Sequence, residues 1–67
     1  MNVKIKINLY EIRTEQGLSI RALEKMSGVP RSTINDTENG KKIPRLDTIC
    51  MLAKSLEVRL EELITFH

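Results

Sequence analysis

Four polar side chains, at positions 31, 32, 35 and 36, have the chemistry to recognise a ligand by hydrogen bonding. In a helix these positions form one outward face. Arg31 can donate two parallel hydrogen bonds to guanine O6 and N7, and Asn35 can pair in the same way with adenine N6 and N7. Asp36 can accept from cytosine N4 or orient Arg31, and Ser32 completes the face. The pattern predicts contact with base edges in double-stranded DNA; the alternative is a solvated helix face.

A second group of residues is suited to binding phosphate. Ser19, together with the free amides of the helix that it opens, makes an anion site, and Arg21 lies in the first turn of that helix. Thr33 can contact a phosphate or a thymine methyl group. Such contacts set the position of a protein on DNA without reading its sequence. Three basic residues that flank positions 31–36 complete the group: Lys41, Lys42 and Arg45.

The sequence does not predict an enzyme or a metalloprotein. Its Ser, Cys and His residues are not arranged as nucleophile and base, and a helical domain of 67 residues has little room for a pocket. Cys50 and His67 alone cannot supply the ligands of a zinc site. We therefore expect no cofactor and no metal, and no small-molecule ligand is indicated because we see no sensor domain.

Length and composition predict one small folded domain over residues 1–67. The chain is 40% hydrophobic and 30% charged, and its apolar residues are mainly Ile and Leu, which favours an all-helical aliphatic core. The single cysteine, Cys50, implies no oxidising compartment. No apolar run approaches the roughly 20 residues that span a bilayer, and no signal peptide is evident. We expect a cytoplasmic protein that does not contact a membrane.

The charge of the chain is unevenly distributed. The net charge of +2 is too small to identify a nucleic-acid binder. Residues 1–45, however, contain nine Lys and Arg against five Asp and Glu, whereas residues 46–67 contain two against four. The basic excess lies in the part of the chain with the candidate DNA-binding residues, which agrees with that interpretation.

The two ends of the chain are expected to be extended and the middle helical. Residues 1–7 alternate between apolar and polar, which predicts a short strand or arm with one buried face. Residues 63–66 also favour a strand, so the two ends could pair. Between them, residues 8–64 form a helical body, and 65–67 form a tail. Asn8 is expected to cap the first helix, with Glu11 closing a capping box.

Two short helices joined by a tight turn follow. Ser19 caps a helix that extends to about Met26. Gly28 suits the left-handed residue after that helix, and Pro30 suits the start of the next, which ends before Gly40 with Ile34 as its inward anchor. Helices joined in this way form a helix-turn-helix unit, whose second helix enters the DNA major groove. The inward face of the first of these helices is predicted from its spacing: Ala22, Leu23 and Met26.

Two more helices are expected over residues 46–56 and 60–64, after a basic loop at 41–44. The helix over 46–56 has apolar residues at helical spacing, with Asp47 near its start, where a negative charge suits the helix dipole. The expected apolar stripe comprises Leu46, Ile49, Cys50, Ala53 and Leu56.

The order and spacing of these elements resemble the helix-turn-helix family of phage repressors and Cro proteins (the Cro/CI or XRE type). The resemblance extends from about Asn8 to Leu63. It implies an all-α, five-helix lambda-repressor-like fold and a sequence-specific DNA-binding transcriptional regulator, a repressor acting as a homodimer on a two-fold operator. The half-sites of such an operator lie about 34–36 Å apart. The matching residues are Leu9, Arg13, Gly17-Leu18-Ser19, Leu23, Gly28-Val29, Ser32-Thr33-Ile34, Glu38-Asn39-Gly40, Pro44, Ile49, Ala53, Leu60 and Leu63.

The resemblance also implies one structural contact, and the chain departs from the family pattern at several positions. Arg13 and Glu38 match a family pair that ties the first helix to the recognition helix. Glu24 stands where the family has a small residue and Thr37 where it has an apolar one, so we expect Glu24 to reach Thr37. Glu57 replaces the common glycine after the fourth helix, at a cost of about 1 kcal/mol if it is left-handed.

The surplus of hydrophobic residues at the C-terminal end is the candidate dimer interface. The alternative is that these residues form the edge of the monomer core. A second function also stays open: a protein-interaction or antitoxin-like module that uses the same fold, because fold alone does not decide function. The candidate interface residues are Leu60, Leu63, Ile64 and Phe66.

Overall fold

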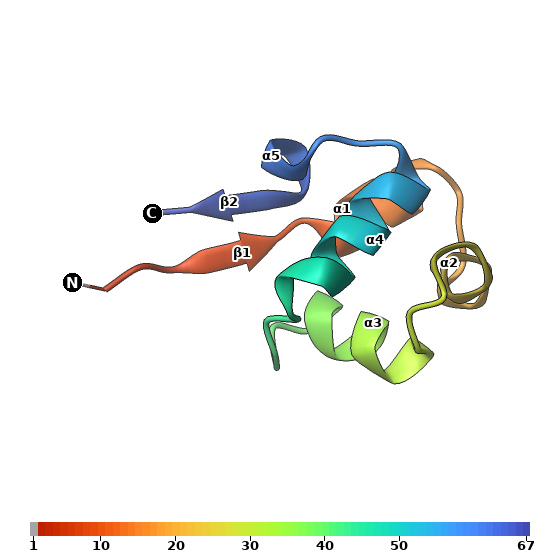
Figure 1. Cartoon of the computed structure of the whole chain (residues 1–67), viewed down its shortest axis with the longest axis horizontal. Coiled ribbons are helices and arrows are strands. Elements are labelled where there is room, and N and C mark those ends of the chain that lie inside the picture. Colours follow the sequence, from red (N-terminus) through yellow and green to blue (C-terminus); the bar gives the residue numbers. More distant parts are fainter. Residues whose placement is uncertain (1) are drawn as a thin grey trace.

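The computed structural model describes residues 2–67, so Met1, which begins the expected segment 1–7, lies outside the described residues. These residues form five helices and a two-stranded ribbon, as expected (Figure 1). None of the helices within 2–67 is long and apolar enough to cross a membrane. The elements in order are β1 (Ile5–Ile7), α1 (Leu9–Glu15), α2 (Ile20–Ser27), α3 (Arg31–Glu38), α4 (Leu46–Leu56), α5 (Leu60–Leu63) and β2 (Ile64–Phe66).

The α2–α3 unit has the local geometry that its sequence predicts. The Ser19 hydroxyl accepts a hydrogen bond from the Ala22 amide at 3.0 Å, which caps the start of α2. Gly28 ends α2 in the left-handed conformation, with φ of 78°, and its amide donates to the Glu24 carbonyl at 2.8 Å. Pro30 follows with φ of −60° directly before α3. The turn therefore fixes the direction in which α3 leaves α2.

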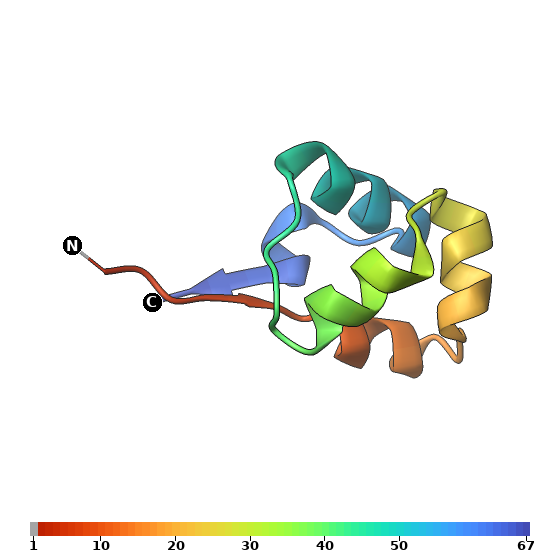
Figure 2. The same ribbon diagram turned by 90° about the horizontal axis from the view of Figure 1, so that it is seen from below.

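All five helices contribute to a single hydrophobic core. In Figures 1 and 2 the helices form one body from which the ribbon projects. Leu9, Leu23 and Ile34 are fully buried and bring α1, α2 and α3 together. The rest of the buried hydrophobic cluster comes mainly from α4: Val29, Ile49, Leu52, Ala53, Leu56 and Leu63.

Two helical faces differ from the expectation. In α4, Leu46 and Cys50 are exposed, whereas Leu52, which the expected stripe omitted, is fully buried. In α2, Met26 is exposed. Because α4 carries apolar residues around most of its circumference, spacing allows more than one inward face, and packing against α2 selects the face that includes Leu52.

The β1–β2 ribbon confirms that the two ends of the chain pair. The strands are antiparallel, with Ile5 opposite Phe66 and Ile7 opposite Ile64. The expected buried face was wrong for most of its length, because Val3 and Ile5 are exposed and only Ile7 packs against the core. The physical reason is that the ribbon extends beyond the helices, so nothing in residues 2–67 covers its outer part (Figure 2). Ile64 belongs to β2, so α5 ends one residue earlier than expected.

The expected capping box at the start of α1 is also wrong. The Asn8 side chain does not cap the helix, and its amide instead donates to the Glu62 carbonyl at 3.3 Å. Glu11 does not reach back to Asn8 but accepts a hydrogen bond from Lys6 Nζ at 2.5 Å. The ribbon explains both changes, because it brings α5 beside Asn8 and β1 beside Glu11.

Candidate nucleic-acid interface

The outward face of α3 carries the residues expected to contact bases. Arg31, Ser32 and Asn35 are exposed, and Asp36 is half-buried. The opposite face of α3 packs against the core through Ile34, which is fully buried. In Figure 2, α3 lies at the surface of the helical body between neighbouring segments. The structure therefore presents these four side chains together on an accessible helix.

Shallow depressions lie on both sides of α3. One lies towards the start of α2, where Arg21 and Ile20 share a surface with Arg31, Ser32 and Asn35. The other lies towards the loop before α4, and its lining includes Ser32, Thr33, Asp36, Lys42 and Arg45. A helix standing between two depressions, each with basic residues in its lining, has the shape of an element that can enter a groove of DNA.

The residues expected to bind phosphate lie around α3 and differ in their exposure and in whether they already make hydrogen bonds within the protein. Arg21, Lys41 and Lys42 are exposed, and Thr33 is half-buried. Ser19 is exposed, but its hydroxyl already caps α2. Arg45 donates two hydrogen bonds to Asp47, at 3.1 and 2.7 Å, and this contact holds the pKa of Asp47 below its usual range. Arg45 would thus have to share its guanidinium between Asp47 and a phosphate.

A contact that sequence reasoning missed joins α2 to the start of α3. Glu24 does not reach Thr37, whose hydroxyl donates to the Thr33 carbonyl at 2.7 Å. One Glu24 oxygen instead accepts from the Arg31 backbone amide at 3.0 Å, and the other lies 3.4 Å from Arg31 Nε. Glu24, rather than Asp36, is therefore the acidic residue in contact with Arg31. The residues are seven apart, and their proximity depends on the left-handed turn at Gly28.

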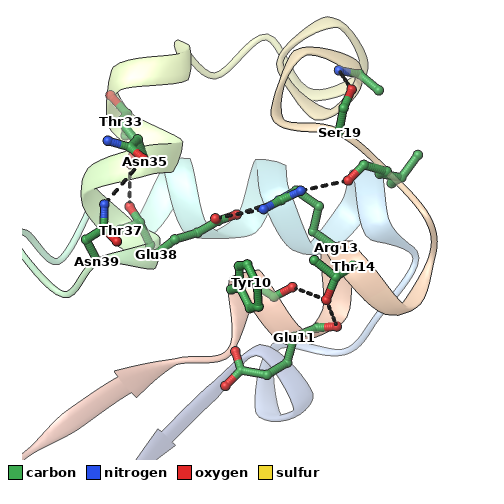
Figure 3. A network of polar contacts seen from close by, with 12 residues as sticks. Tyr10, Glu11, Arg13, Thr14, Ser19, Thr33, Asn35, Thr37, Glu38 and Asn39 are labelled. Atoms are coloured by element: carbon green, nitrogen blue, oxygen red, sulfur yellow. Dashed lines mark hydrogen bonds and ion pairs between the residues drawn. The ribbon is translucent and has the colours of Figure 1, made fainter.

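The other end of α3 is held by an ion pair with α1 (Figure 3). Arg13 Nε and Nη2 donate to the two carboxylate oxygens of Glu38 at 2.6 and 2.9 Å, and Arg13 Nη1 donates to the Leu18 carbonyl at 2.8 Å. The side chains are only 10% and 6% exposed. The hydrogen-bonded Glu38 carboxylate raises the pKa of Arg13, which stays charged. Side chains from two other helices thus hold both ends of α3.

The candidate dimer interface is only partly exposed. Leu63 is fully buried in the monomer core, so its place in the expected interface is corrected in favour of the core alternative. Leu60 and Phe66 are exposed and, with the half-buried Ile64, line a shallow apolar depression. Strand pairing adds the exposed Ile5, opposite Phe66 on the same face of the ribbon. The sequence did not reveal Ile5, because a one-sided apolar strand ordinarily faces the core.

The family is established by comparison of the sequence. Residues 9–63 match the family model described as Helix-turn-helix (HTH_3). The chain therefore belongs to the helix-turn-helix family of the Cro/CI or XRE type, a family of DNA-binding transcriptional regulators.

Solved structures agree with this assignment. The restriction-modification controller protein C.AhdI from Aeromonas hydrophila is 36% identical, with a TM-score of 0.78 over 82% of this chain and 83% of the controller chain. An HTH_3 family transcriptional regulator from Vibrio cholerae is 28% identical, with a TM-score of 0.75 over 79% of this chain. The match covers only 30% of the Vibrio chain. No curated protein matches the sequence.

Proposed function

We propose that this chain is a sequence-specific regulator that inserts α3 into the major groove of double-stranded DNA. The observation that carries the proposal is the exposed polar face of α3, held at one end by Glu24 and at the other by Arg13. A helix fixed at both ends presents Arg31 and Asn35 to base edges in a constant orientation. Basic side chains on either side of α3 would then anchor the phosphates.

One such unit covers only a few base pairs, so the proposal includes a homodimer on a two-fold operator. The homodimer is supported by the exposed apolar side chains of Leu60, Phe66 and Ile5, since removing such a patch from water would stabilise the association of two copies. A dimer seated on an operator would block access to the promoter, which makes repression the proposed outcome. The similar controller protein makes restriction-modification genes the first targets to examine, and its bacterial source favours action in the cytoplasm.

Selection from a random pool of duplex DNA, at about 150 mM salt, tests the function. We expect an enriched two-fold sequence whose half-sites are about 10 base pairs apart from centre to centre. An unenriched pool, together with binding to random duplex that disappears near physiological salt, would contradict the proposal. That result would favour the protein-interaction module instead.

A further inference from the structure

The start of α3 lacks the usual means of capping a helix. Its N-cap residue is Pro30, whose side chain offers no acceptor to the first free amides of the helix, of which that of Arg31 is one, so a protein partner for them must come from another residue. Glu24 supplies that partner from α2, through a hydrogen bond of 3.0 Å. One carboxylate oxygen therefore caps the helix that presents the candidate base-contacting residues.

The second oxygen of Glu24 lies beside the side chain of Arg31 as an ion-pair partner. It lies 3.4 Å from Nε, on the inner edge of the guanidinium. Among residues 2–67, the two terminal Nη groups of Arg31 donate to no other group, and the side chain is 60% exposed. An arginine held through Nε can still offer a parallel pair of donors through Nη1 and Nη2. Guanine O6 and N7 accept such a pair.

We propose that Glu24 is a positioning residue for base recognition, which holds Arg31 so that its two Nη groups meet a guanine end-on. The inference rests on the proposed function, because it assumes that α3 enters the major groove. It assigns a role to a position where the family has a small residue. Glu24 has a second effect in the same site: its negative charge offsets Arg31 and disfavours phosphate binding at random sequences.

The expected size of the effect follows from side-chain freedom. An unrestrained Arg31 would lose rotamer freedom on binding guanine, and it could also turn to a nearby phosphate. The entropic cost of immobilising one long side chain on binding corresponds to a change in affinity of about 2- to 10-fold. Removing the Glu24 charge should therefore weaken discrimination at one base pair by about this factor, while binding to random duplex becomes tighter.

The test compares Glu24→Gln with Glu15→Gln, measured on the selected operator, on its single-base-pair variants and on random duplex. Gln keeps an acceptor for the Arg31 amide but removes the charge, and thermal melting checks that α3 stays capped. Glu15 is exposed at the end of α1, so its variant controls for the same change in net charge. We expect Glu24→Gln alone to lose about 2- to 10-fold discrimination at a single guanine. We also expect its salt slope on random duplex to steepen by about one unit.

Arg31→Lys gives an independent check, because lysine keeps the charge and the backbone amide but lacks the fork of donors. It should lose discrimination at the same guanine, and adding Glu24→Gln should then change discrimination no further. The inference is overturned if Glu24→Gln weakens binding to all sequences equally, or if Arg31→Lys retains full discrimination at the guanine. In either case the proposed function stands as long as the parent chain selects an operator. Failure to select any operator for the parent chain overturns the proposed function and the inference together.

Discussion

Arg13 in α1 and Glu38 at the end of α3 form a bidentate ion pair that is almost completely buried. A third hydrogen bond joins Arg13 to the Leu18 carbonyl, and the guanidinium lies 5.4 Å from the centre of the Tyr10 ring. The pair therefore links α1, the loop before α2 and α3 (Figure 3). It holds the C-terminal end of α3 against the first helix.

Breaking this pair should destabilise the domain strongly. Arg13→Met leaves the Glu38 carboxylate buried without its partner, which costs about 3 kcal/mol or more. Urea denaturation would measure this as a lower midpoint. The double variant Arg13→Met, Glu38→Leu should recover most of the loss, because the unpaired charge is removed. A single variant as stable as the parent would contradict the structural role of the pair.

The ion pair also shows what the sequence can predict. The family resemblance implied the contact between Arg13 and Glu38, and local rules predicted the Ser19 cap and the left-handed Gly28. These features depend on nearby residues or on a pattern shared by related chains. The helices were predictable for the same reason, whereas the pairing of the two ends, which are far apart in the sequence, was inferred from the strand-like pattern of each end.

The features that sequence reasoning missed depend on contacts between distant segments. Asn8 had a good capping sequence, but the paired ribbon places it beside Glu62. Leu52 was omitted from the inward stripe because α4 is apolar on more than one face. Glu24 reaches Arg31 rather than Thr37 because the turn after α2 aims the start of α3 towards it. Spacing along one helix cannot reveal such contacts.

Two substitutions should separate base reading from phosphate anchoring. Arg31→Ala should relax specificity by about 1–3 kcal/mol at one base pair, because a bidentate contact to guanine is lost. Lys42→Ala should weaken all sequences alike and reduce the salt slope by about one unit. Titrations of operator and random duplex at several salt concentrations measure both effects. Equal losses on both duplexes for Arg31→Ala would refute its assignment as a base-contacting residue.

The apolar end of the molecule should govern association. Phe66 is 70% exposed, so Phe66→Ser should weaken the proposed dimer with little effect on the folded monomer. Leu63→Ala is the matched contrast: Leu63 is fully buried, and its truncation should cost about 2–5 kcal/mol of folding stability. Sedimentation at micromolar concentration and thermal melting distinguish the two. A parent chain that stays monomeric at operator-binding concentrations would argue against this interface.

The contact between Lys6 and Glu11 predicts a small pH dependence. The hydrogen bond from Lys6 holds the pKa of Glu11 below its ordinary value, so the contact stabilises the fold above that value. The contribution should disappear as the pH falls through the pKa of the folded state. Both side chains are largely exposed, so we expect less than about 0.5 kcal/mol, weakened further by salt. Melting of the parent and Glu11→Gln at a series of acidic pH values should show the two converging; a constant difference would contradict this origin.

Glu57, at the end of α4, is the position where a glycine should stabilise the protein. Its backbone is left-handed, with φ of 57° and ψ of 42°, and the next amide, of Val58, donates back to the Ala53 carbonyl at 3.1 Å. A left-handed conformation costs a residue with a Cβ about 1–2 kcal/mol, and glycine avoids this cost. Part of the gain is offset because glycine has greater conformational freedom in the unfolded chain. Glu57→Gly should therefore gain about 0.5–1 kcal/mol, and each kcal/mol raises the melting temperature of so small a domain by about 4–8 °C. Glu57→Ala removes the same charge but keeps the Cβ, so only the glycine variant should gain in this way. If alanine stabilised the protein as much as glycine, the gain would come from the lost charge near the helix C-terminus rather than from the backbone.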